Sequence, residues 1–504
     1  MPARLTTRAQ VNGYRFLLRR LEHALIRRDS RMIHDPMRSQ VRAMLVGFVI
    51  CVLVVGACAA LAIFKPAPSL GNSAIVESDS SGALYVRLND RLHPALNLAS
   101  ARLIAGKPDK PARVKDKDLR SLPAGPTLGI VGAPAAIEKA DDLTRSDWTV
   151  CDTSTNTDRD TQPVRDETVV VSSKPRLTPD IGVAPADAAG IAVGADGKSY
   201  LIYEGKRAQI DPTDPVLVNA LKITDSSFIR ASASLLDSLR AAPPISRIVI
   251  PDAGQPTSLR FDQQVTIGTI VTSMESSGDH QYVVLKDTLS PVTDVTADII
   301  RFSNPALLGD PVEVSPAALN SLPVAPGLPV DVSQYPKNMP QYTLNTASTV
   351  CNHWFGPSLS QNPSTELLVG DRLPIPDDAR PATLVSADGD GPRVDAAYIP
   401  PGTGEFVQAA SQGRVAGQLF YISDTGMRYP IPDPKTGDML GVQGVRSADG
   451  KNTLPQLAPW NVVSLLPAGP TLSVPAALIA HGGFDGDTGG VPTSEEKSSD
   501  GGGN

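Results

Sequence analysis

The longest apolar pattern along the chain is a run of twenty-two uncharged residues, Ala43 to Phe64, bounded by Arg42 and Lys65. As an α-helix this run would extend about 33 Å, enough to cross a hydrocarbon core of about 30 Å. We therefore predict a single transmembrane helix over residues 43–64.

A cleaved signal peptide is the alternative interpretation of this run, and Ala60-Leu61-Ala62 resembles a cleavage site. The apolar part of such a peptide covers only about 7–15 residues and follows a short basic region. Here about forty residues come first, which favours a permanent anchor.

A second periodic pattern precedes the span, in the region 1–42. Six apolar residues recur there at spacings of three and four: Val11, Tyr14, Leu17, Leu18, Leu21 and Leu25. This period predicts an amphipathic helix of about six turns. Thr7 followed by Gln10 fits a capping box at its start. The apolar face needs a cover, either a partner protein, which we favour, or a membrane surface.

Beyond the span, one strand-turn-strand theme occurs four times. Its copies begin at Ala83, Ser199, Gln281 and Leu419, and each combines aliphatic and aromatic residues with a polar turn and a proline. Such segments are typical of β-strands. A short segment with Leu and Ser, which predicts a helix, is then followed by a Pro-rich segment. These paired segments begin at Asp118, Leu235, Ala318 and Asn461. The expected class is therefore mainly β with short helices.

The first and fourth copies are the most similar, because Pro123–Leu128 and Pro467–Leu472 both read PAGPTL. Repeats of this kind bury little alone and need neighbours. Likeness between the outermost copies suggests a quasi-two-fold arrangement around a central core domain. The expected segments are repeat 1 at 65–139, a first central core segment at 140–195, repeat 2 at 196–262, repeat 3 at 263–335, a second central core segment at 336–415, repeat 4 at 416–481 and a disordered Gly-rich tail at 482–504.

The two expected core segments each carry one cysteine, Cys151 and Cys351. Oxidising compartments favour pairing, and a disulfide closing a loop of about 200 residues would stabilise the fold by about 5 kcal/mol on the chain-entropy model. Two free buried thiols are the alternative. Cys51 and Cys58 lie within the apolar run and are expected to be plain apolar residues.

Charge gives the chain a direction. The net charge is −7, yet residues 1–42 hold ten Arg against three acidic residues, about +7, which leaves about −14 for the rest. The positive-inside rule places such an Arg-rich flank in the cytoplasm. A basic cluster confined to that flank is not the folded recognition surface of a nucleic-acid-binding protein, so no nucleic-acid partner is expected.

No catalytic pattern stands out. The one segment resembling a phosphate-binding loop, Ala192 to Ser199, has Ala where the first Gly belongs and runs into strand-like residues. The six His are scattered singly, and Cys351-Asn352-His353 alone is weak evidence for zinc. We expect no catalytic, cofactor-binding or metal-binding residues, and the enzyme class is left open, leaning towards none.

The N-terminal RAQVNGYRFLLRRLEHALIRRD, the single span and the SLPAGPTL-type units resemble the EccB family over nearly the whole chain. That family is a core membrane component of the mycobacterial type VII (ESX) secretion system. The resemblance implies a cytoplasmic N-terminal helix, one transmembrane helix and a periplasmic domain of four repeats around a central core.

The resemblance also implies residence in the cell inner membrane with the EccC ATPase, the EccD and EccE subunits, a nearby mycosin protease and other copies of the chain. The expected function is that of a structural core subunit for protein export. Two alternatives remain. Family members have been labelled ATPases, which would make the chain an extracytoplasmic ATP hydrolase, and a likeness of the repeat fold to a phage lysin subunit would make it a cell-wall-binding module.

Overall fold

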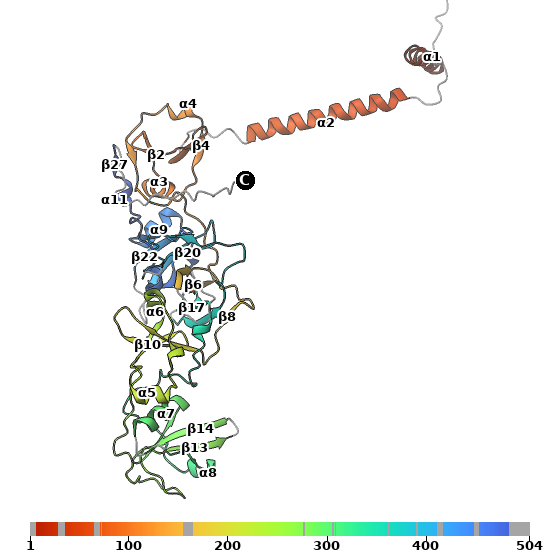
Figure 1. Ribbon diagram of the computed structural model, residues 1–504. Helices are drawn as coiled ribbons and strands as arrows, with labels where there is room; N and C mark the ends of the chain where they lie inside the picture. The colour runs from red at the N-terminus through yellow and green to blue at the C-terminus, as the bar shows by residue number, and fades with distance from the viewer. Residues whose placement is uncertain are drawn as a thin grey trace, which may run out of the picture. The chain divides into compact units, whose positions relative to one another are not determined.

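The computed structural model describes residues 7–28, 36–64, 71, 73–154, 165–275, 278–304, 307, 309–360, 362–389, 392–410, 417–447 and 453–482 (Figure 1). The chain divides into two compact units, Met1–Gly71 and Asn72–Asn504. We call them the N-terminal unit and the C-terminal unit and treat each by itself. Apart from Gly482, the tail expected to be disordered lies outside the described residues.

The N-terminal unit contains two helices. Helix α1 spans Arg8–Arg27, and the backbone N–H of Thr7 donates to Oε1 of Gln10 at 3.0 Å. This contact is half of the predicted capping box, and it occupies a backbone group that helix formation leaves without a partner. Arg28 ends the helix in the left-handed conformation, with its N–H bonded to the carbonyl of Ala24 at 2.9 Å.

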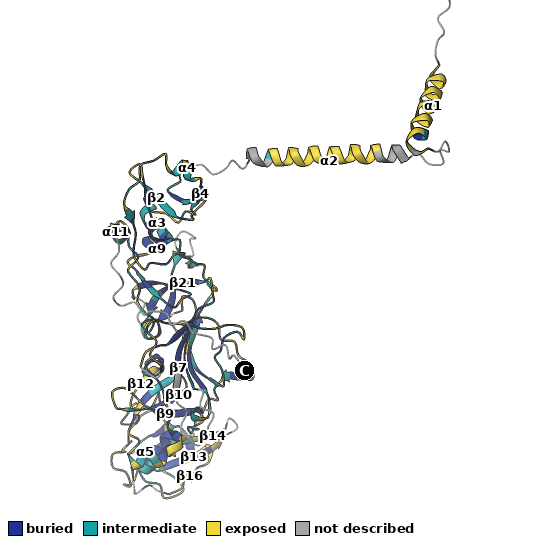
Figure 2. Ribbon diagram, turned by 45° about the horizontal axis from the view of Figure 1, so that its top comes forward, coloured by how far each residue is buried: buried dark blue, intermediate teal, exposed yellow. Residues whose placement is uncertain are grey.

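Helix α2 spans Pro36–Phe64 and contains the predicted span. It begins seven residues before Ala43, because Pro suits the first position of a helix and nothing in residues 37–42 breaks one. Val41–Ala60 is the stretch that is long and apolar enough to cross a membrane. Its side chains are almost all exposed, as Figure 2 shows. An exposed apolar surface of this length needs lipid or protein around it.

The C-terminal unit holds four small sheets of four strands each. In each sheet a helix follows the third strand along the chain and precedes the fourth. The first has β1 (Ile75–Ser78), β2 (Leu84–Leu88), β3 (Arg91–Pro94), α3 (Leu98–Ala105) and β4 (Ala112–Val114); the second has β9 (Ala189–Val193), β10 (Ser199–Tyr203), β11 (Lys206–Ile210), α5 (Pro215–Ala220) and β12 (Arg240–Ala242). The third has β13 (Ile270–Glu275), β14 (Gly278–Val284), β15 (Leu289–Val292), α7 (Asp294–Ser303) and β16 (Val312–Glu313); the fourth has β21 (Gly404–Ala410), β22 (Leu419–Ser423), β23 (Arg428–Ile431), α9 (Pro434–Leu440) and β26 (Gln456–Pro459).

The four small sheets have closely related strand orders. In the first, third and fourth, three antiparallel strands are joined by a fourth strand parallel to the first, in the orders β3-β2-β1-β4, β15-β14-β13-β16 and β23-β22-β21-β26. The second sheet, β12-β11-β10-β9, instead adds its fourth strand beside the third. There the position parallel to the first strand is reduced to a single bridge between Ile191 and Phe228.

The Pro-rich segments after the short helices pair with the third strand of their own sheets. Ala124 bridges Leu92 in the first sheet, and Ala468 bridges Arg428 in the fourth. The approach is so close that a Cβ atom on Gly125 would lie 2.2 Å from Cε1 of His93. The equivalent Gly469 would bring a Cβ atom to 2.5 Å from Cε1 of Tyr429. This contact explains why both copies of PAGPTL carry glycine at the third position.

A larger, seven-stranded sheet lies between the small ones in sequence. Its order is β19-β20-β7-β6-β17-β18-β8, with β6 (Arg145–Ser154), β7 (Arg165–Val171), β8 (Ile181–Val183), β17 (Thr349–Pro357), β18 (Ser364–Gly370), β19 (Ala382–Thr383) and β20 (Ala396–Tyr398). We call it the central sheet. All its strands come from the segments expected to form a core, 140–195 and 336–415.

The remaining elements are short. The helix signals built on Leu and Ser form α4 (Asp116–Leu119), α6 (Ala233–Ser238), α8 (Pro316–Leu319) and α10 (Trp460–Val463). The others are η1 (Asp225–Ser227), η3 (Leu344–Thr346), α11 (Val474–Ala477) and the paired strands β24 (Val445–Arg446) with β25 (Thr453–Leu454) and β5 (Thr127–Leu128) with β27 (Ala480–His481).

Three hydrophobic cores connect these sheets. One is shared by the first and fourth small sheets, where Leu103 packs in a cluster with Phe406 and Tyr421. A second is shared by the second and third small sheets. The third joins the central sheet, around Trp148, to the second and fourth small sheets. Buried apolar contact of this kind is the main force holding the unit together.

Candidate functional site

The six predicted apolar residues form one exposed stripe on α1. At 3.6 residues per turn they fall within an arc of about 120°, which is the width of a helix face that packs on a neighbour. Their exposed fractions run from 39% for Val11 to 76% for Leu25. Phe16 and Ile26, on other faces, are exposed as well. We call the six residues the α1 stripe; its partner stays a prediction.

The two cysteines of the C-terminal unit form a disulfide, so the predicted pairing is present. Cys151 on β6 and Cys351 on β17 are direct partners in the antiparallel register, with Cα atoms 4.0 Å apart. Both are fully buried and pack with Ile181 and Leu368. The bond therefore crosses the middle of the central sheet and joins strands that lie two hundred residues apart in sequence.

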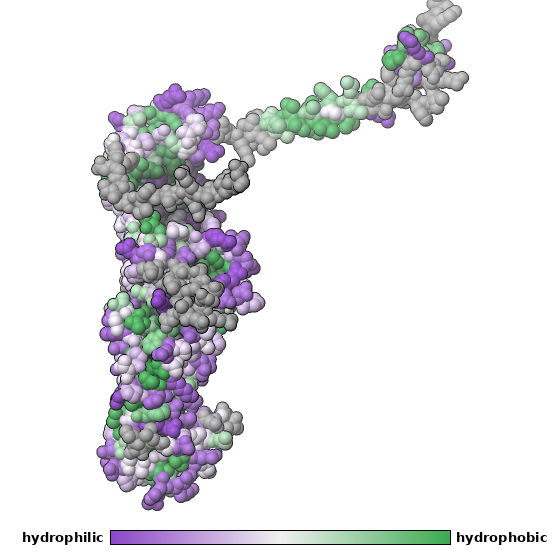
Figure 3. Space-filling model, viewed as in Figure 1, coloured by the Kyte–Doolittle hydropathy of each residue, from purple (hydrophilic) through white to green (hydrophobic). Residues whose placement is uncertain are grey.

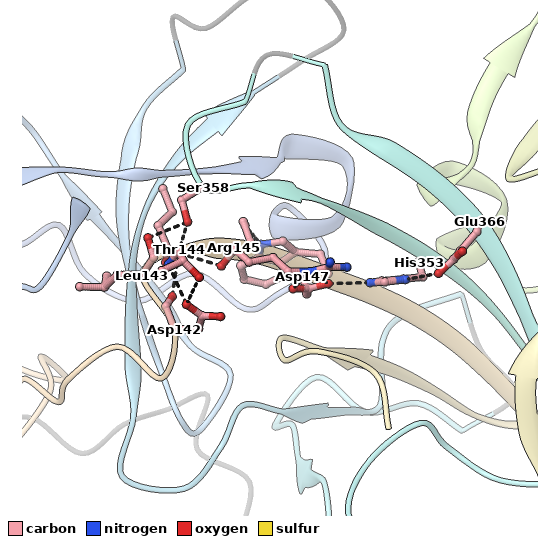
Figure 4. Close-up of polar contacts among 11 residues, drawn as sticks. Asp142, Leu143, Thr144, Arg145, Asp147, His353, Ser358 and Glu366 are labelled. Carbon is pink, nitrogen blue, oxygen red and sulfur yellow. Dashed lines mark hydrogen bonds and ion pairs between the residues drawn. The ribbon is translucent and has the colours of Figure 1, made fainter. Parts of the chain in front are cut away.

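His353, two residues after Cys351, lies at the centre of a buried charged network (Figure 4). Its Nδ1 lies 2.9 Å from Oε1 of Glu366, and its Nε2 lies 2.9 Å from Oδ1 of Asp147. Arg145 donates from Nε to both carboxylate oxygens of Asp147, at 2.6 and 2.8 Å. An imidazolium, which carries a proton on both nitrogens, satisfies both contacts of the ring.

The charge on Asp147 is stabilised by these neighbours. Burial by itself raises the pKa of this carboxyl, but the hydrogen bonds and charges of His353 and Arg145 outweigh it, so the pKa lies below its ordinary value. The same contact raises the pKa of Arg145. The ring of Phe355 stacks on His353 at 4.7 Å and lies under the Arg145 guanidinium at 4.8 Å. The network therefore joins β6, β17 and β18 on one face of the central sheet.

A neutral network continues from there to the fourth small sheet. Nε2 of Gln456 on β26 donates to the carbonyls of Asp142 and Arg145 and to Oγ of Ser358, at 2.8, 3.0 and 3.0 Å. Ser358 in turn donates to the carbonyl of Leu143 at 2.9 Å. Gln456 is almost fully buried, so these bonds fix β26 against the start of β6.

The second small sheet is held to the central sheet at both ends of α6. At its N-terminus, Ser232 donates from its backbone N and from Oγ to the carboxylate of Asp152 on β6, at 2.6 and 2.7 Å. At its C-terminus, Nδ2 of Asn352 on β17 donates to the carbonyl of Ser238 at 2.9 Å. Asn461 on α10 binds the same carbonyl at 2.8 Å. Helices from two small sheets therefore meet over the central one.

Glu405 on β21 is an acidic group whose pKa is strongly shifted by its surroundings. Burial, together with the negative charges of Asp141, Asp147 and Asp142, raises its pKa to about 7 against a hydrogen bond from Ser172 that lowers it. Oγ of Ser172 donates to Oε1 of Glu405 at 2.6 Å. This carboxyl changes its charge close to neutral pH.

The segment resembling a phosphate-binding loop forms a hairpin. Strand β9 ends at Val193, β10 begins at Ser199, and these two residues pair. Between them, the N–H of Gly194 donates to the carbonyl of Lys198 at 2.8 Å. A Walker A loop would instead open a helix. Among the described residues no group of three or more His, Cys, Asp or Glu side chains could hold a metal ion.

Sequence reasoning did not find the His353 network. Its residues alternate on paired strands, with Arg145, Asp147 and Cys151 on β6 and with Cys351, His353 and Phe355 on β17. The alternation is visible in the sequence, but only the register shows that the polar positions meet. Cys351 and His353, weighed together as a zinc site, have separate partners.

Comparison with known proteins identifies the relatives of this architecture. A family model described as type VII secretion system ESX-1, transport TM domain B, matches residues 3–485. The ESX-3 secretion system ATPase EccB3 of Mycolicibacterium smegmatis is 35% identical over 497 residues, covering 94% of this chain and 90% of the relative. The ESX-1 secretion system ATPase EccB1 of Mycobacterium tuberculosis is 34% identical over 491 residues, covering 95% of this chain and 96% of the relative.

Two solved structures are also similar. A chain of an intact ESX-5 inner membrane complex aligns with a TM-score of 0.68 and 30% identity, covering 98% of this chain and 99% of that one. A chain of the EccB3 dimer from the ESX-3 core complex aligns with a TM-score of 0.68 and 33% identity, covering 81% and 100%. On the family match and these relatives, the chain belongs to the EccB family of type VII secretion proteins.

Proposed function

We propose that this chain is a structural core subunit of a type VII secretion membrane complex and serves protein export. One observation carries the proposal: the match to a chain of the ESX-5 inner membrane complex covers both the exposed apolar helix and the C-terminal unit. A subunit anchored in the membrane by one helix, with most of its mass in a folded outer unit, suits a scaffold.

We propose that the N-terminus lies in the cytoplasm and the C-terminal unit in the periplasm. The arginines before α2 support this orientation by the positive-inside rule. The disulfide supports it independently, because disulfides persist in oxidising compartments outside the cytoplasm. A related structure is that of the periplasmic assembly from the ESX-5 inner membrane complex. Protease access to the region of residue 100 in spheroplasts tests the orientation, and protection there would reverse it.

The α1 stripe supplies the cytoplasmic contact in this proposal. Its six side chains are exposed on a helix next to the membrane anchor, where a second attachment to lipid would add little. We therefore assign the stripe to docking on cytoplasmic portions of the complex, with the EccC ATPase and the EccD and EccE subunits as the expected partners and a mycosin protease nearby.

We also propose that the four small sheets are structural repeats, paired first with fourth and second with third about a quasi-two-fold axis through the central sheet. The related strand orders and the two shared hydrophobic cores support this arrangement. The expected segments 65–139, 196–262, 263–335 and 416–481 remain our proposal for the repeats, with the second extended back to β9 and the fourth back to β21, because these strands pair within the second and fourth small sheets. Copies of the chain would associate through the C-terminal unit, since the related EccB3 of the ESX-3 core complex is a dimer.

The names of the two relatives contain the word ATPase. We do not carry this activity over, because the segment Ala192–Ser199 forms a hairpin turn between two strands. In our proposal the EccC ATPase drives the export, and this chain holds the machine together.

Affinity purification of the full chain from mild-detergent extracts of native membranes tests the function. The chain should recover other membrane subunits of the secretion system, and its deletion should stop export of their substrates. Normal export in the deletion strain would refute the proposal. Export lost without loss of the complex would point to a role other than a scaffold.

A further inference from the structure

The first small sheet carries a cluster of exposed basic side chains. Residues 107–120 hold six basic and three acidic residues, a net charge of +3. All six basic residues are exposed: Lys107, Lys110, Arg113, Lys115, Lys117 and Arg120. We call them the basic face. Figure 3 shows hydrophilic atoms gathered over this region of the sheet.

Much of this charge is unpaired. Lys107 lies 3.0 Å from the carboxylate of Asp109, and Arg113 lies 3.4 Å from the carboxylate of Glu77. The basic side chain of each pair is exposed. Exposed pairs of this kind contribute little to stability. Lys110, Lys115 and Lys117 form no ion pair with any residue that the structure describes.

One of the three carboxylates in this segment is occupied within the sheet itself. Asp116, at the start of α4, accepts a hydrogen bond from Oγ of Ser78 at 2.7 Å and another from the hydroxyl of Ser80. These two bonds lower the pKa of Asp116. The carboxylate fixes α4 to the end of β1, and the lysines beside it point to solvent.

The chain also limits how far this face lies from the membrane. Ten residues separate Phe64, the last residue of α2, from Ile75, the first residue of β1, so these ends are at most about 40 Å apart. The basic face belongs to β4 and α4, and β4 pairs directly with β1. It is therefore close to the point where the chain enters the C-terminal unit.

The third small sheet provides an internal comparison. Its equivalent segment, 304–319, includes β16 and α8 and contains Asp310 and Glu313 but no basic residue. The chain beyond residue 42 carries about −14 overall. A basic face is thus not a general property of this segment in the small sheets. Charged residues on an edge strand can prevent its pairing with another chain, and β4 is an edge strand. This role explains only Arg113, because the other five basic residues lie outside β4.

We propose that the basic face binds the anionic headgroups of lipids in the membrane that α2 crosses, on the side of the C-terminal unit. The proposal rests on the membrane anchoring described above. Basic side chains within a Debye length of an anionic bilayer surface are attracted to it. Such contact would hold the first small sheet against the membrane and so set the orientation of the whole C-terminal unit.

Lysine acetylation on the full chain in lipid nanodiscs tests this inference. Discs of phosphatidylcholine alone are compared with discs containing equal amounts of phosphatidylcholine and phosphatidylglycerol, and modified lysines are counted by mass spectrometry. Lys110, Lys115 and Lys117 should react about threefold more slowly in the anionic discs. The protection should disappear between about 0.1 M and about 1 M salt, as the Debye length falls from about 10 Å to about 3 Å. Lys198, on the second small sheet, should react equally in both.

Charge reversal tests whether the basic face itself causes the protection. In the Lys110→Glu, Lys115→Glu variant the remaining Lys117 should lose its protection, whereas the Lys198→Glu, Lys435→Glu variant, changed outside the first small sheet, should keep it. Equal reaction in both kinds of disc would overturn the proposal. Equal protection of these lysines in neutral discs would also overturn it, because a second copy of the chain would then cover the basic face. Protection in neutral discs that appears only with added inorganic phosphate would identify a free anion as the occupant, which overturns it as well. Failure of the chain to enter discs would instead contradict the membrane anchoring.

Discussion

At the scale of single residues, the charged network on the central sheet shows what burial demands of polar groups. His353 and Asp147 are almost completely enclosed, and each finds partners of opposite charge or matching hydrogen-bond capacity. A buried charge without such partners is strongly unfavourable. The network is therefore sensitive to the loss of any one member.

Asp147→Asn should lower the free energy of unfolding by about 3 kcal/mol, because it leaves Arg145 and the His353 ring facing a neutral amide. Denaturation followed by tryptophan fluorescence measures this, since Trp148, Trp354 and Trp460 all lie in the C-terminal unit. Asp90→Asn, in the exposed pair with Arg87, is the matched control and should change stability by less than about 0.5 kcal/mol. Equal effects of the two variants would contradict the role of the network.

Lowering the pH should remove the contribution of Asp147 to the free energy of unfolding. The pKa of Asp147 is lowered in the folded state, so its stabilising effect is present above the ordinary carboxyl value and is lost as the pH falls through the folded pKa. The difference between wild type and Asp147→Asn should therefore shrink in acid.

Glu405 predicts the opposite dependence on pH. Its pKa rises from 4.5 to about 7 on folding, so its favourable contribution is complete below about pH 4.5 and is lost as the pH rises through about 7. Glu405→Gln keeps an oxygen for Ser172 but removes the charge. At pH 8 the variant should be more stable than wild type by about 1 to 2 kcal/mol. This is less than the full pKa shift would give, because the side chain of Glu405 is only partly buried and solvent screens its charge. At pH 4.5 the two proteins should unfold alike. A constant difference across this range would show that the carboxyl does not titrate.

At the scale of elements, the disulfide joins the two strands at the middle of the central sheet. Cys151→Ser should lower the melting temperature in oxidising buffer, since the closed loop of about 200 residues contributes about 5 kcal/mol on the chain-entropy model. Adding a thiol reductant to wild type should reproduce most of that loss. Cys58→Ser on α2 should leave melting unchanged. An unaltered melting temperature in Cys151→Ser would contradict a stabilising bond.

The α1 stripe predicts a separation of function from folding. Replacing Leu17, Leu18 and Leu21 by Asp should release the chain from its complex and stop export, because charge on the stripe opposes apolar docking. The C-terminal unit should melt at its wild-type temperature. Phe16→Asp with Ile26→Asp, on other faces of α1, should keep the complex. Export that survives the triple change would end the docking proposal.

The elements best predicted from the sequence are those with a strong period or a distinctive turn. The apolar run and the three-and-four spacing predict α2 and α1, and Tyr85, Tyr203, Tyr282 and Tyr421 mark strands of the four small sheets. The theme begins at the second strand of each sheet. Their first strands share no pattern across all four sheets, as β1 (IVES) and β9 (AGIAV) show, and their fourth strands are only two to four residues long. Such strands are defined by what they pair with.

The His353 network could not be predicted for a related reason. Asp147 and His353 are separated by more than two hundred residues, and they meet because β6 and β17 pair in one particular register. A shift of that register by one residue would turn each polar side chain to the opposite face. The cysteines indicated that the two segments meet, but not how.

At the scale of the whole molecule, the outermost small sheets share a core and β27 pairs with β5, so the end of the outer unit returns to its beginning. In our proposal the Arg-rich flank before the apolar run sets the direction of the chain across the bilayer. Both features agree with the proposed scaffold, which is anchored in the membrane by α2 and carries most of its mass in the C-terminal unit.

The central claim, that this chain is a structural core subunit of a secretion membrane complex, is tested most directly by native electrophoresis of membranes solubilised in mild detergent. We predict that the chain migrates in a high-mass complex together with the ATPase and other membrane subunits, and that the Leu17, Leu18 and Leu21 replacement shifts it to a smaller species while the outer unit stays folded. Migration of the wild-type chain as a monomer or dimer, free of every other secretion subunit, would contradict it.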